Sequence, residues 1–162
     1  EVVELPWLGR LGGSSLTEAS QAIPEIRPDQ LDELLTIQKT AKSVWVPNRN
    51  GILINAAAAF AERLGAERVV VGFNREEAVT FPDNSVEFLN RATDALRLST
   101  ANGVQVHCYT GDLDKREIVA RLRGLERKFP FEKIWSCYFG AMLPCGTCES
   151  CQRLKRALGE AK

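Results

Sequence analysis

Residues 68–73 read Arg-Val-Val-Val-Gly-Phe, a continuous apolar run that decides the fold class. A run of this kind is typical of a strand that is covered on both faces, as in a parallel sheet. The preceding stretch, Gly51 to Leu64, contains four consecutive alanines and is followed by Gly65. This pattern predicts a buried helix that ends at a glycine. We therefore expect a helix that leads directly into a buried strand.

The chain after this strand continues to alternate between helix and strand. Residues 84–98 place apolar side chains on one helical stripe, and residues 104–109 form a second strand-like run. Residues 114–125 predict a charged amphipathic helix. Alternation of this kind with short connections predicts an α/β fold with a Rossmann-like, doubly wound parallel sheet.

The first 50 residues are less regular. Residues 2–8 predict a short strand broken by Pro6, and Val44 to Val46 predict another, followed by a turn at residues 47–50. Residues 24–33 are rich in Pro, Asp and Glu, so we expect a mobile or partly ordered loop there. Residues 12–15 read Gly-Gly-Ser-Ser, but a phosphate loop joins a buried strand to a helix. We therefore interpret them as a flexible loop.

Composition excludes several classes of protein. The chain has 162 residues, 44% of them hydrophobic, so a fully disordered protein is excluded. Lys plus Arg and Asp plus Glu number 21 each, and this zero net charge argues against a dedicated nucleic-acid binder. No apolar run reaches the roughly 18 residues of a membrane span, and no signal peptide opens the chain. We expect a cytoplasmic protein with no direct nucleic-acid binding.

Four of the five cysteines gather near the C-terminus, at Cys137, Cys145, Cys148 and Cys151. Four thiolates at these spacings can converge on one tetrahedral ion, and a site of four sulfurs favours a closed structural zinc site. An iron–sulfur cluster is the alternative; disulfides are disfavoured because no secretory signal is present. We divide the chain into an α/β core, residues 1–134, and a zinc knuckle with a final helix, residues 135–162.

The remaining cysteine and the single histidine are adjacent in the second predicted strand. Cys108 is expected to be an inert core thiol, because free cysteine behaves as a small hydrophobe. His107 points to the opposite side of the strand and is expected to be structural rather than a metal ligand.

Polar residues beside the predicted strands and helices are candidates for ligand binding. Arg49 follows a predicted strand and could pair with a phosphate or carboxylate; a solvated arginine in a capping turn is equally compatible. Asp83 could accept two N–H groups from a guanine-like edge, although Asp83 or Asn84 could equally be a helix N-cap. Lys115 opens a helix against the dipole preference, which favours contact with an anion.

Several motifs occur together in a recognisable order. They are Ser14-Ser15-Leu16-Thr17 with Ile23-Pro24, Val46-Pro47-Asn48-Arg49-Asn50, Val71-Gly72-Phe73, Phe81-Pro82-Asp83, Asp114-Lys115 with Glu117-Ile118, and the four C-terminal cysteines. In this order the chain resembles, over nearly its whole length, the 7-cyano-7-deazaguanine synthase family (QueC/ExsB) of the PP-loop ATP-pyrophosphatase superfamily. The cysteine knuckle and the Pro-x-Arg-Asn turn are specific in combination.

The resemblance implies a function. It implies an ATP-dependent carbon–nitrogen ligase, a homodimer with structural Zn²⁺, that converts 7-carboxy-7-deazaguanine and ammonia to 7-cyano-7-deazaguanine in queuosine or archaeosine biosynthesis, with Mg²⁺ accompanying ATP. By position, Arg49 and Lys115 would be catalytic anion contacts, and Asp83, Asn50 and Phe81 would bind the substrate.

One family motif does not occur in these residues. The ATP motif Ser-Gly-Gly-x-Asp-Ser is absent, and Met142 is the only methionine. We expect this loop to lie upstream of Glu1 or on a second chain, so that the chain by itself does not hydrolyse ATP. Two alternatives stay open: a paralogue that acts on another carboxylate or deazapurine, and a non-catalytic zinc-knuckle binding subunit.

Overall fold

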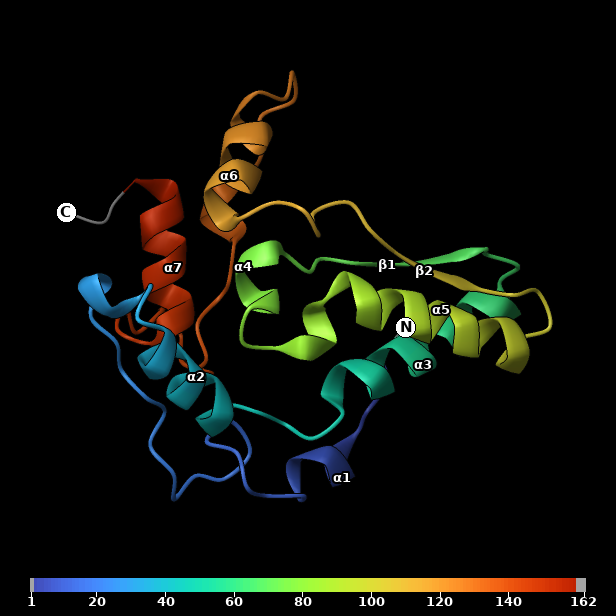
Figure 1. The fold of residues 1–162 in the computed structure, drawn as a ribbon, viewed down its shortest axis with the longest axis horizontal. Coiled ribbons are helices and arrows are strands. Elements are labelled where there is room, and N and C mark those ends of the chain that lie inside the picture. The colour runs from blue at the N-terminus through green and yellow to red at the C-terminus, as the bar shows by residue number, and fades with distance from the viewer. Residues whose placement is uncertain (1, 160–162) are drawn as a thin grey trace. The chain divides into compact units, whose positions relative to one another are not determined.

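A computed structural model describes residues 2–159 of the chain, which divides into two compact units (Figure 1). One unit comprises residues 48–114. The other combines the residues up to Pro47 with those from Lys115 onward. Each unit brings together different candidate residues, so each is described by itself.

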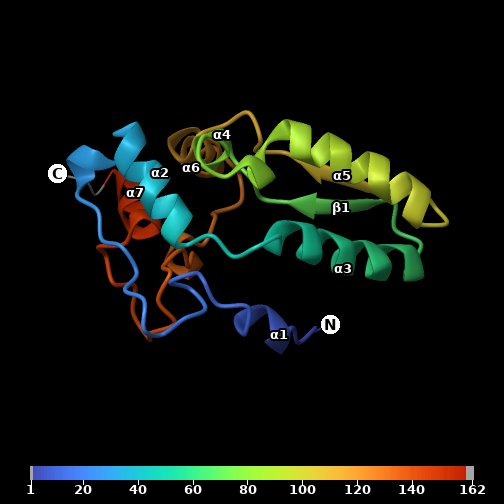
Figure 2. The ribbon, with the colours of Figure 1, turned by 60° about the horizontal axis from the view of Figure 1, so that its bottom comes forward.

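The unit of residues 48–114 is built on a small parallel sheet. Strands β1 (Arg68–Val71) and β2 (Gln105–Cys108) pair in parallel, with Arg68 opposite Gln105 and Val71 opposite Cys108. Helix α3 (Arg49–Arg63) packs against β1 and α5 (Val86–Ser99) against β2. Both helices run alongside the strands in Figure 2. The predicted α/β class with a parallel sheet is confirmed.

The two helices and the sheet enclose one apolar core. Its members are Ile54, Ala58, Ala61, Phe73, Leu89, Leu96, Val104 and Val106. Full burial of an aliphatic side chain contributes about 1.5–3 kcal/mol, so this cluster stabilises the unit. On the strand itself Val70 is 57% exposed, so the expectation of a strand covered on both faces is wrong. The reason is that α3 and α5 share the core on the side of Val69 and Val71.

Side chains complete the hydrogen bonding around this sheet. The Thr93 hydroxyl accepts from the Val106 amide at 3.0 Å and donates to the Val106 carbonyl at 3.4 Å. A side chain of α5 therefore bonds both backbone polar groups of Val106 in β2. Beyond the strands, the Thr110 hydroxyl donates to the Phe73 carbonyl at 2.6 Å, and the Arg75 guanidinium donates to the Asp112 carbonyl at 2.7 Å. The loops that follow β1 and β2 are therefore tied together. Two short elements lie between β1 and α5: α4 (Arg75–Ala78) and η2 (Pro82–Asn84).

The other unit is built from helices and loops. Its elements are α1 (Pro6–Gly9), η1 (Pro28–Gln30), α2 (Leu34–Ser43), α6 (Lys115–Arg123), η3 (Phe131–Lys133) and α7 (Glu149–Leu158). Helices α6 and α7 contact each other, and α7 also contacts η1. An antiparallel bridge joins Glu25 to Cys148.

Neither of the two strands predicted in the first 50 residues forms among the described residues. The prediction for residues 2–8 is wrong: Pro6 opens the one-turn helix α1, a position where its missing amide costs nothing. The prediction for Val44 to Val46 is also wrong. Val44 is the C-cap residue of α2, and its amide donates to the Thr40 carbonyl at 3.2 Å. Residues 45–46 are irregular.

The expected loose loops are packed instead. Within residues 24–33, Ile26 and Leu31 are buried and form a small cluster with Ile37, so apolar contacts order this polar stretch. At residues 12–15, Ser14 is completely buried, and both the amide and the hydroxyl of Ser15 donate to the Ser43 carbonyl. The flexible loop expected there is therefore a buried turn against the end of α2.

None of the helices within residues 2–159 combines the length and the apolar character required to cross a membrane.

Candidate metal centre and polar site

The four C-terminal cysteines meet at the start of α7. Cys148 is the N-cap residue of this helix, and Cys151 lies in its first turn. Cys145 precedes Gly146, whose φ of +75° is left-handed and suits glycine. This turn reverses the chain so that Cys145 faces the helix, and Cys137 approaches from the preceding loop.

Their sulfur atoms are spaced as ligands of one metal ion. The four Sγ atoms lie within 4.8 Å of one another, and those of Cys145 and Cys151 are 3.9 Å apart. Zinc–sulfur bonds of about 2.3 Å in a tetrahedron place neighbouring sulfurs about 3.8 Å apart. The arrangement therefore fits a tetrahedral ion with little rearrangement.

Backbone amides point at the sulfurs as they do around metal-bound thiolates. The amides of Phe139 and Cys145 donate to Cys137 Sγ at 3.3 and 3.4 Å. Those of Thr147 and Cys148 donate to Cys145 Sγ at 3.4 and 3.3 Å. Hydrogen bonds to the charged form of a group favour that form, so the loop is preorganised for anionic sulfur.

The thiols respond unequally to this environment. Burial opposes ionisation of Cys145, but the amides of Cys148 and Thr147 outweigh it and lower its pKa to about 6. Burial raises the pKa of Cys148, and burial together with the neighbouring Cys148 and Cys137 sulfurs raises the pKa of Cys151 to about 12. Sulfurs this close ionise together only when a cation compensates their charge.

The donor set suits zinc and offers no open position. Four sulfurs and no carboxylate or histidine form the cluster, which is the composition of closed structural sites. Cys137, Cys148 and Cys151 are buried and Cys145 is exposed. The residues fit a structural metal ion, which would link the loop of Cys137 to α7.

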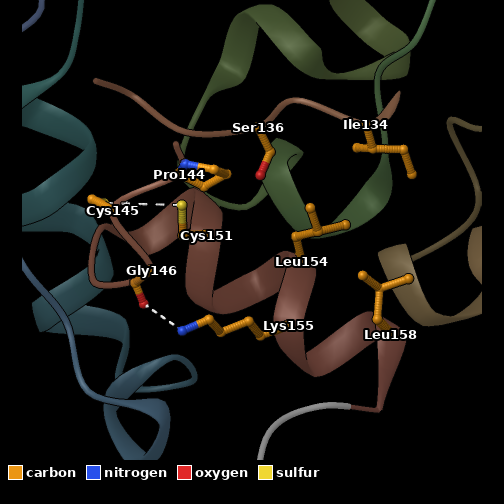
Figure 3. A pocket seen from close by; sticks show the side chains of 9 residues that line it. All are labelled: Ile134, Ser136, Pro144, Cys145, Gly146, Cys151, Leu154, Lys155 and Leu158. Carbon is orange, nitrogen blue, oxygen red and sulfur yellow. Dashed lines mark hydrogen bonds between the residues drawn. The ribbon is translucent and has the colours of Figure 1, made fainter. Parts of the chain in front are cut away.

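A pocket of about 350 Å³ borders the cysteine cluster (Figure 3). Cys145 and Cys151 form part of its wall, and Leu154 and Leu158 of α7 form another part. The Lys155 ammonium donates to the Gly146 carbonyl at 3.1 Å, and this carbonyl also accepts from the Gln152 amide at 2.8 Å. Two side chains of α7 thus stabilise the turn between Cys145 and Cys148.

In the unit of residues 48–114, three of the predicted site residues come together. Arg49 and Asn50 open α3, and Asp83 lies in η2. Burial raises the pKa of Asp83, while the Arg49 charge and a hydrogen bond from Asn50 act in the opposite direction. Asn84 also donates to Asp83, at 3.3 Å. A half-buried carboxylate is therefore held among donors at the start of a long helix.

The other two predicted site residues lie in different units. Phe81 is half-buried and immediately precedes η2. Lys115 is half-buried and is the first residue of α6, in the other unit.

The structure corrects one helix cap. Neither Asp83 nor Asn84 caps α5; the Ser85 hydroxyl does so, accepting from the Phe88 amide at 3.1 Å. Asp83 is thereby left for other contacts.

Two residues near the cysteines were missed by the sequence analysis. Glu149 and Arg153 are buried charged residues on α7. Their spacing of four residues on a helix is the signal that could have paired them. Burial of the pair has no sequence signal, because the same spacing is common on solvated helix faces.

The remaining candidate thiol and imidazole lie in β2. Cys108 packs against the apolar core, and its thiol donates to the Phe73 carbonyl at 3.3 Å. The His107 ring meets Tyr109 edge to face, with centroids 4.3 Å apart.

Comparison with known proteins identifies the family. The family model for queuosine biosynthesis protein QueC matches residues 1–162. The 7-cyano-7-deazaguanine synthase of Bdellovibrio bacteriovorus is 54% identical over 161 residues, which cover 99% of this chain and 69% of that protein. The synthase of Desulforamulus reducens is 53% identical over 156 residues, covering 96% and 68%. That of Methanosarcina mazei is 43% identical over 159 residues, also covering 96% and 68%. With the fold and the cysteine cluster in agreement, the chain belongs to the QueC family.

Proposed function

We propose that this chain forms part of a 7-cyano-7-deazaguanine synthase, which converts 7-carboxy-7-deazaguanine and ammonia to 7-cyano-7-deazaguanine with ATP. The observation that carries this proposal is the 54% and 53% identity, over nearly the whole chain, to two proteins named for that product. An activity in queuosine biosynthesis also agrees with the family description.

The reaction requires two activations of the same carbon. The substrate carboxylate attacks the α-phosphorus of ATP, and pyrophosphate leaves. Ammonia then attacks the acyl carbon, AMP leaves with the former carboxylate oxygen, and loss of a proton gives the amide. The amide oxygen is activated by a second ATP in the same way. Loss of AMP and of the nitrogen-bound protons then yields the nitrile.

The polar group around Asp83 offers matching chemistry for the deazaguanine. A carboxylate can accept both the ring N–H and the exocyclic amine of a guanine-like edge, in a bidentate pair. Asn50 and Asn84 contact Asp83 and would fix its orientation, and the Phe81 ring offers an apolar surface for the planar base. We propose Arg49 and Lys115, which belong to different units, as contacts for the carboxylate and the phosphates, because both carry positive charge.

The proposal also includes the metals and the assembly. The cysteine cluster would hold Zn²⁺ as a structural ion, and Mg²⁺ would accompany ATP. We also propose that residues 1–134 and 135–162 act as catalytic core and knuckle, that the protein is a homodimer, and that it works in the cytoplasm.

Product analysis of the intact protein tests the proposal. The protein is incubated with 7-carboxy-7-deazaguanine, ammonium and Mg-ATP, and the nitrile is measured by mass spectrometry. Arg49→Ala should lower kcat/KM by roughly 100-fold, because removal of one charged contact in a site costs on the order of 3 kcal/mol. Arg63→Ala, at the exposed far end of the same helix, is the matched control and should leave the rate unchanged.

Other outcomes discriminate between the alternatives. ATP–pyrophosphate exchange with a different carboxylate, and none with 7-carboxy-7-deazaguanine, would identify a paralogue. Absence of exchange with any deazapurine acid, combined with deazaguanine binding, would identify a non-catalytic binding subunit. Either result would overturn the synthase assignment.

A further inference from the structure

Helix α7 carries a buried ion pair beside the cysteines. Glu149 and Arg153 are 3% and 5% exposed, one turn apart on the helix. The Arg153 Nε donates to Glu149 Oε1 at 2.9 Å, and one terminal nitrogen lies 2.8 Å from the same oxygen. Charged side chains are rarely buried to this extent without a specific arrangement of partners.

The pair reaches beyond its own helix to two other segments of the same unit. The Arg153 guanidinium donates to the Leu31 carbonyl at 3.2 Å, just after η1. From α2, the Thr40 hydroxyl donates to the second carboxylate oxygen of Glu149. The ion pair therefore joins α7 to the segment of residues 31–40 through both of its members.

This junction lies directly at the metal ligands. Glu149 follows Cys148 in the chain and precedes Cys151 by two residues, so its backbone lies between two cysteines of the cluster. Further hydrogen bonds hold the segment between Cys145 and Cys148. The Ile26 amide donates to the Thr147 carbonyl at 3.1 Å, and the Thr147 hydroxyl donates to the Glu25 carboxylate at 3.0 Å.

A buried ion pair is better suited to fixing orientation than to adding stability. Desolvation of the two charges consumes most of their attraction, so an apolar pair of similar volume often stabilises a fold equally well. In contrast, the hydrogen bonds of Glu149 and Arg153 are directional, and their partners outside α7 lie on two different segments. Metal affinity depends strongly on groups that orient the ligands, typically by 10–100-fold.

We propose that Glu149 and Arg153 are positioning residues for the metal centre. They fix the rotation of α7 about its axis, so that Cys148 and Cys151 face Cys137 and Cys145. The inference rests on the metal site of the proposed function, and it does not depend on the synthase reaction.

Metal affinity of the intact protein tests this inference. Zn²⁺ affinity is measured by chelator competition, and the absorption spectrum of the Co²⁺ form reports tetrahedral thiolate coordination. Glu149→Gln keeps the shape of the side chain and removes its charge; we expect a roughly 10–100-fold loss of affinity and an altered Co²⁺ spectrum. Asp32→Asn is the matched control. Asp32 accepts from Arg156 of the same helix at 2.9 Å and is 80% exposed, so affinity should change less than about twofold.

Thr40→Val is a gentler variant that keeps the ion pair and removes the bond from α2 to Glu149, together with the contact of the same hydroxyl to the Ile37 carbonyl within α2. If Glu149→Gln does not fold, this variant still tests the inference, and we expect an intermediate loss of roughly 3–10-fold. Equal affinities and spectra in wild type and the folded variants would overturn the positioning role, even if the melting temperature falls. An equal loss in Asp32→Asn would overturn it too. A wild-type protein that binds neither Co²⁺ nor Zn²⁺ would overturn the metal site itself.

Discussion

Different interactions stabilise each of the two units of this chain. Residues 48–114 enclose eight buried apolar side chains between two helices and a parallel sheet. Among the described residues of the other unit, the aliphatic cluster has three members, and a second cluster has three buried cysteines. Small cores generally need a metal or disulfides as additional support. From this difference we infer that the unit of residues 48–114 folds on its own core, whereas the other unit would depend on a metal ion bound by its cysteines.

Removal of a metal ligand should break this comparison most strongly. Cys148→Ser, or chelation of the wild-type metal, should unfold the cysteine-bearing unit, because metal binding at structural zinc sites supplies on the order of 10 kcal/mol. Hydrogen exchange followed by mass spectrometry should show loss of protection in α7 and in residues 25–31. Protection in α3 and α5 should persist.

The fifth cysteine provides the control for this experiment. Cys108→Ser changes a thiol of the other unit, whose hydrogen bond to Phe73 a hydroxyl can reproduce. It should leave metal content unchanged. Equal loss of protection in both units on chelation would show that they do not differ in the way we infer.

A cavity in the aliphatic core is the converse experiment. Leu96 is 3% exposed, and Leu96→Ala should destabilise the unit of residues 48–114 by about 2–5 kcal/mol without changing metal affinity. Leu98→Ala, on the same helix but 92% exposed, should cost little. Denaturant unfolding with and without metal measures both effects. A fall in zinc affinity in Leu96→Ala would contradict the independence of the two units.

The pH dependence of metal binding is a further test of the cysteine-bearing unit. Because the pKa of Cys151 is about 12 and that of Cys148 is raised by burial, both thiols carry protons near neutrality in the metal-free protein. A metal ion must displace them, so apparent affinity should rise with pH, by on the order of 100-fold per unit for two protons. Calorimetry in buffers of different ionisation enthalpy counts the released protons. Binding that is independent of pH between 6 and 8 would contradict this account.

Sequence patterns predicted the two units unequally. The apolar run at residues 68–73 and the alanine-rich stretch before it were sufficient to predict the strand β1 and the helix α3, because composition and periodicity specify such elements locally, but they did not predict the exposure of Val70. The strands predicted at residues 2–8 and at Val44 to Val46 failed. Short apolar runs are ambiguous, and their outcome depends on tertiary partners that the local sequence does not specify.

The candidate sites show the same limit. Cysteine spacing was sufficient to predict that Cys137, Cys145, Cys148 and Cys151 would converge. The buried pair of Glu149 and Arg153 could not be predicted, because its partners are more than 100 residues distant in the chain. The catalytic and substrate roles of the residues around Asp83 stay predictions.

Substitution of Asp83 has the smallest expected effect on stability, and it tests whether this residue serves the reaction or the fold of the unit of residues 48–114. Burial raises the pKa of this carboxyl, so its ionised form costs stability as pH rises through that raised pKa. Asp83→Asn should therefore unfold at the same or a higher temperature near pH 7, whereas kcat/KM for the deazaguanine should fall by roughly 100-fold, because an amide presents a donor to the guanine-like edge. Asp94→Asn, exposed on α5, should change neither quantity. Scanning calorimetry and product assays on the intact protein measure the two effects. A lower melting temperature with an unchanged kcat/KM would show that Asp83 serves the fold. A carboxylate that serves substrate binding should instead lower the stability of the folded protein.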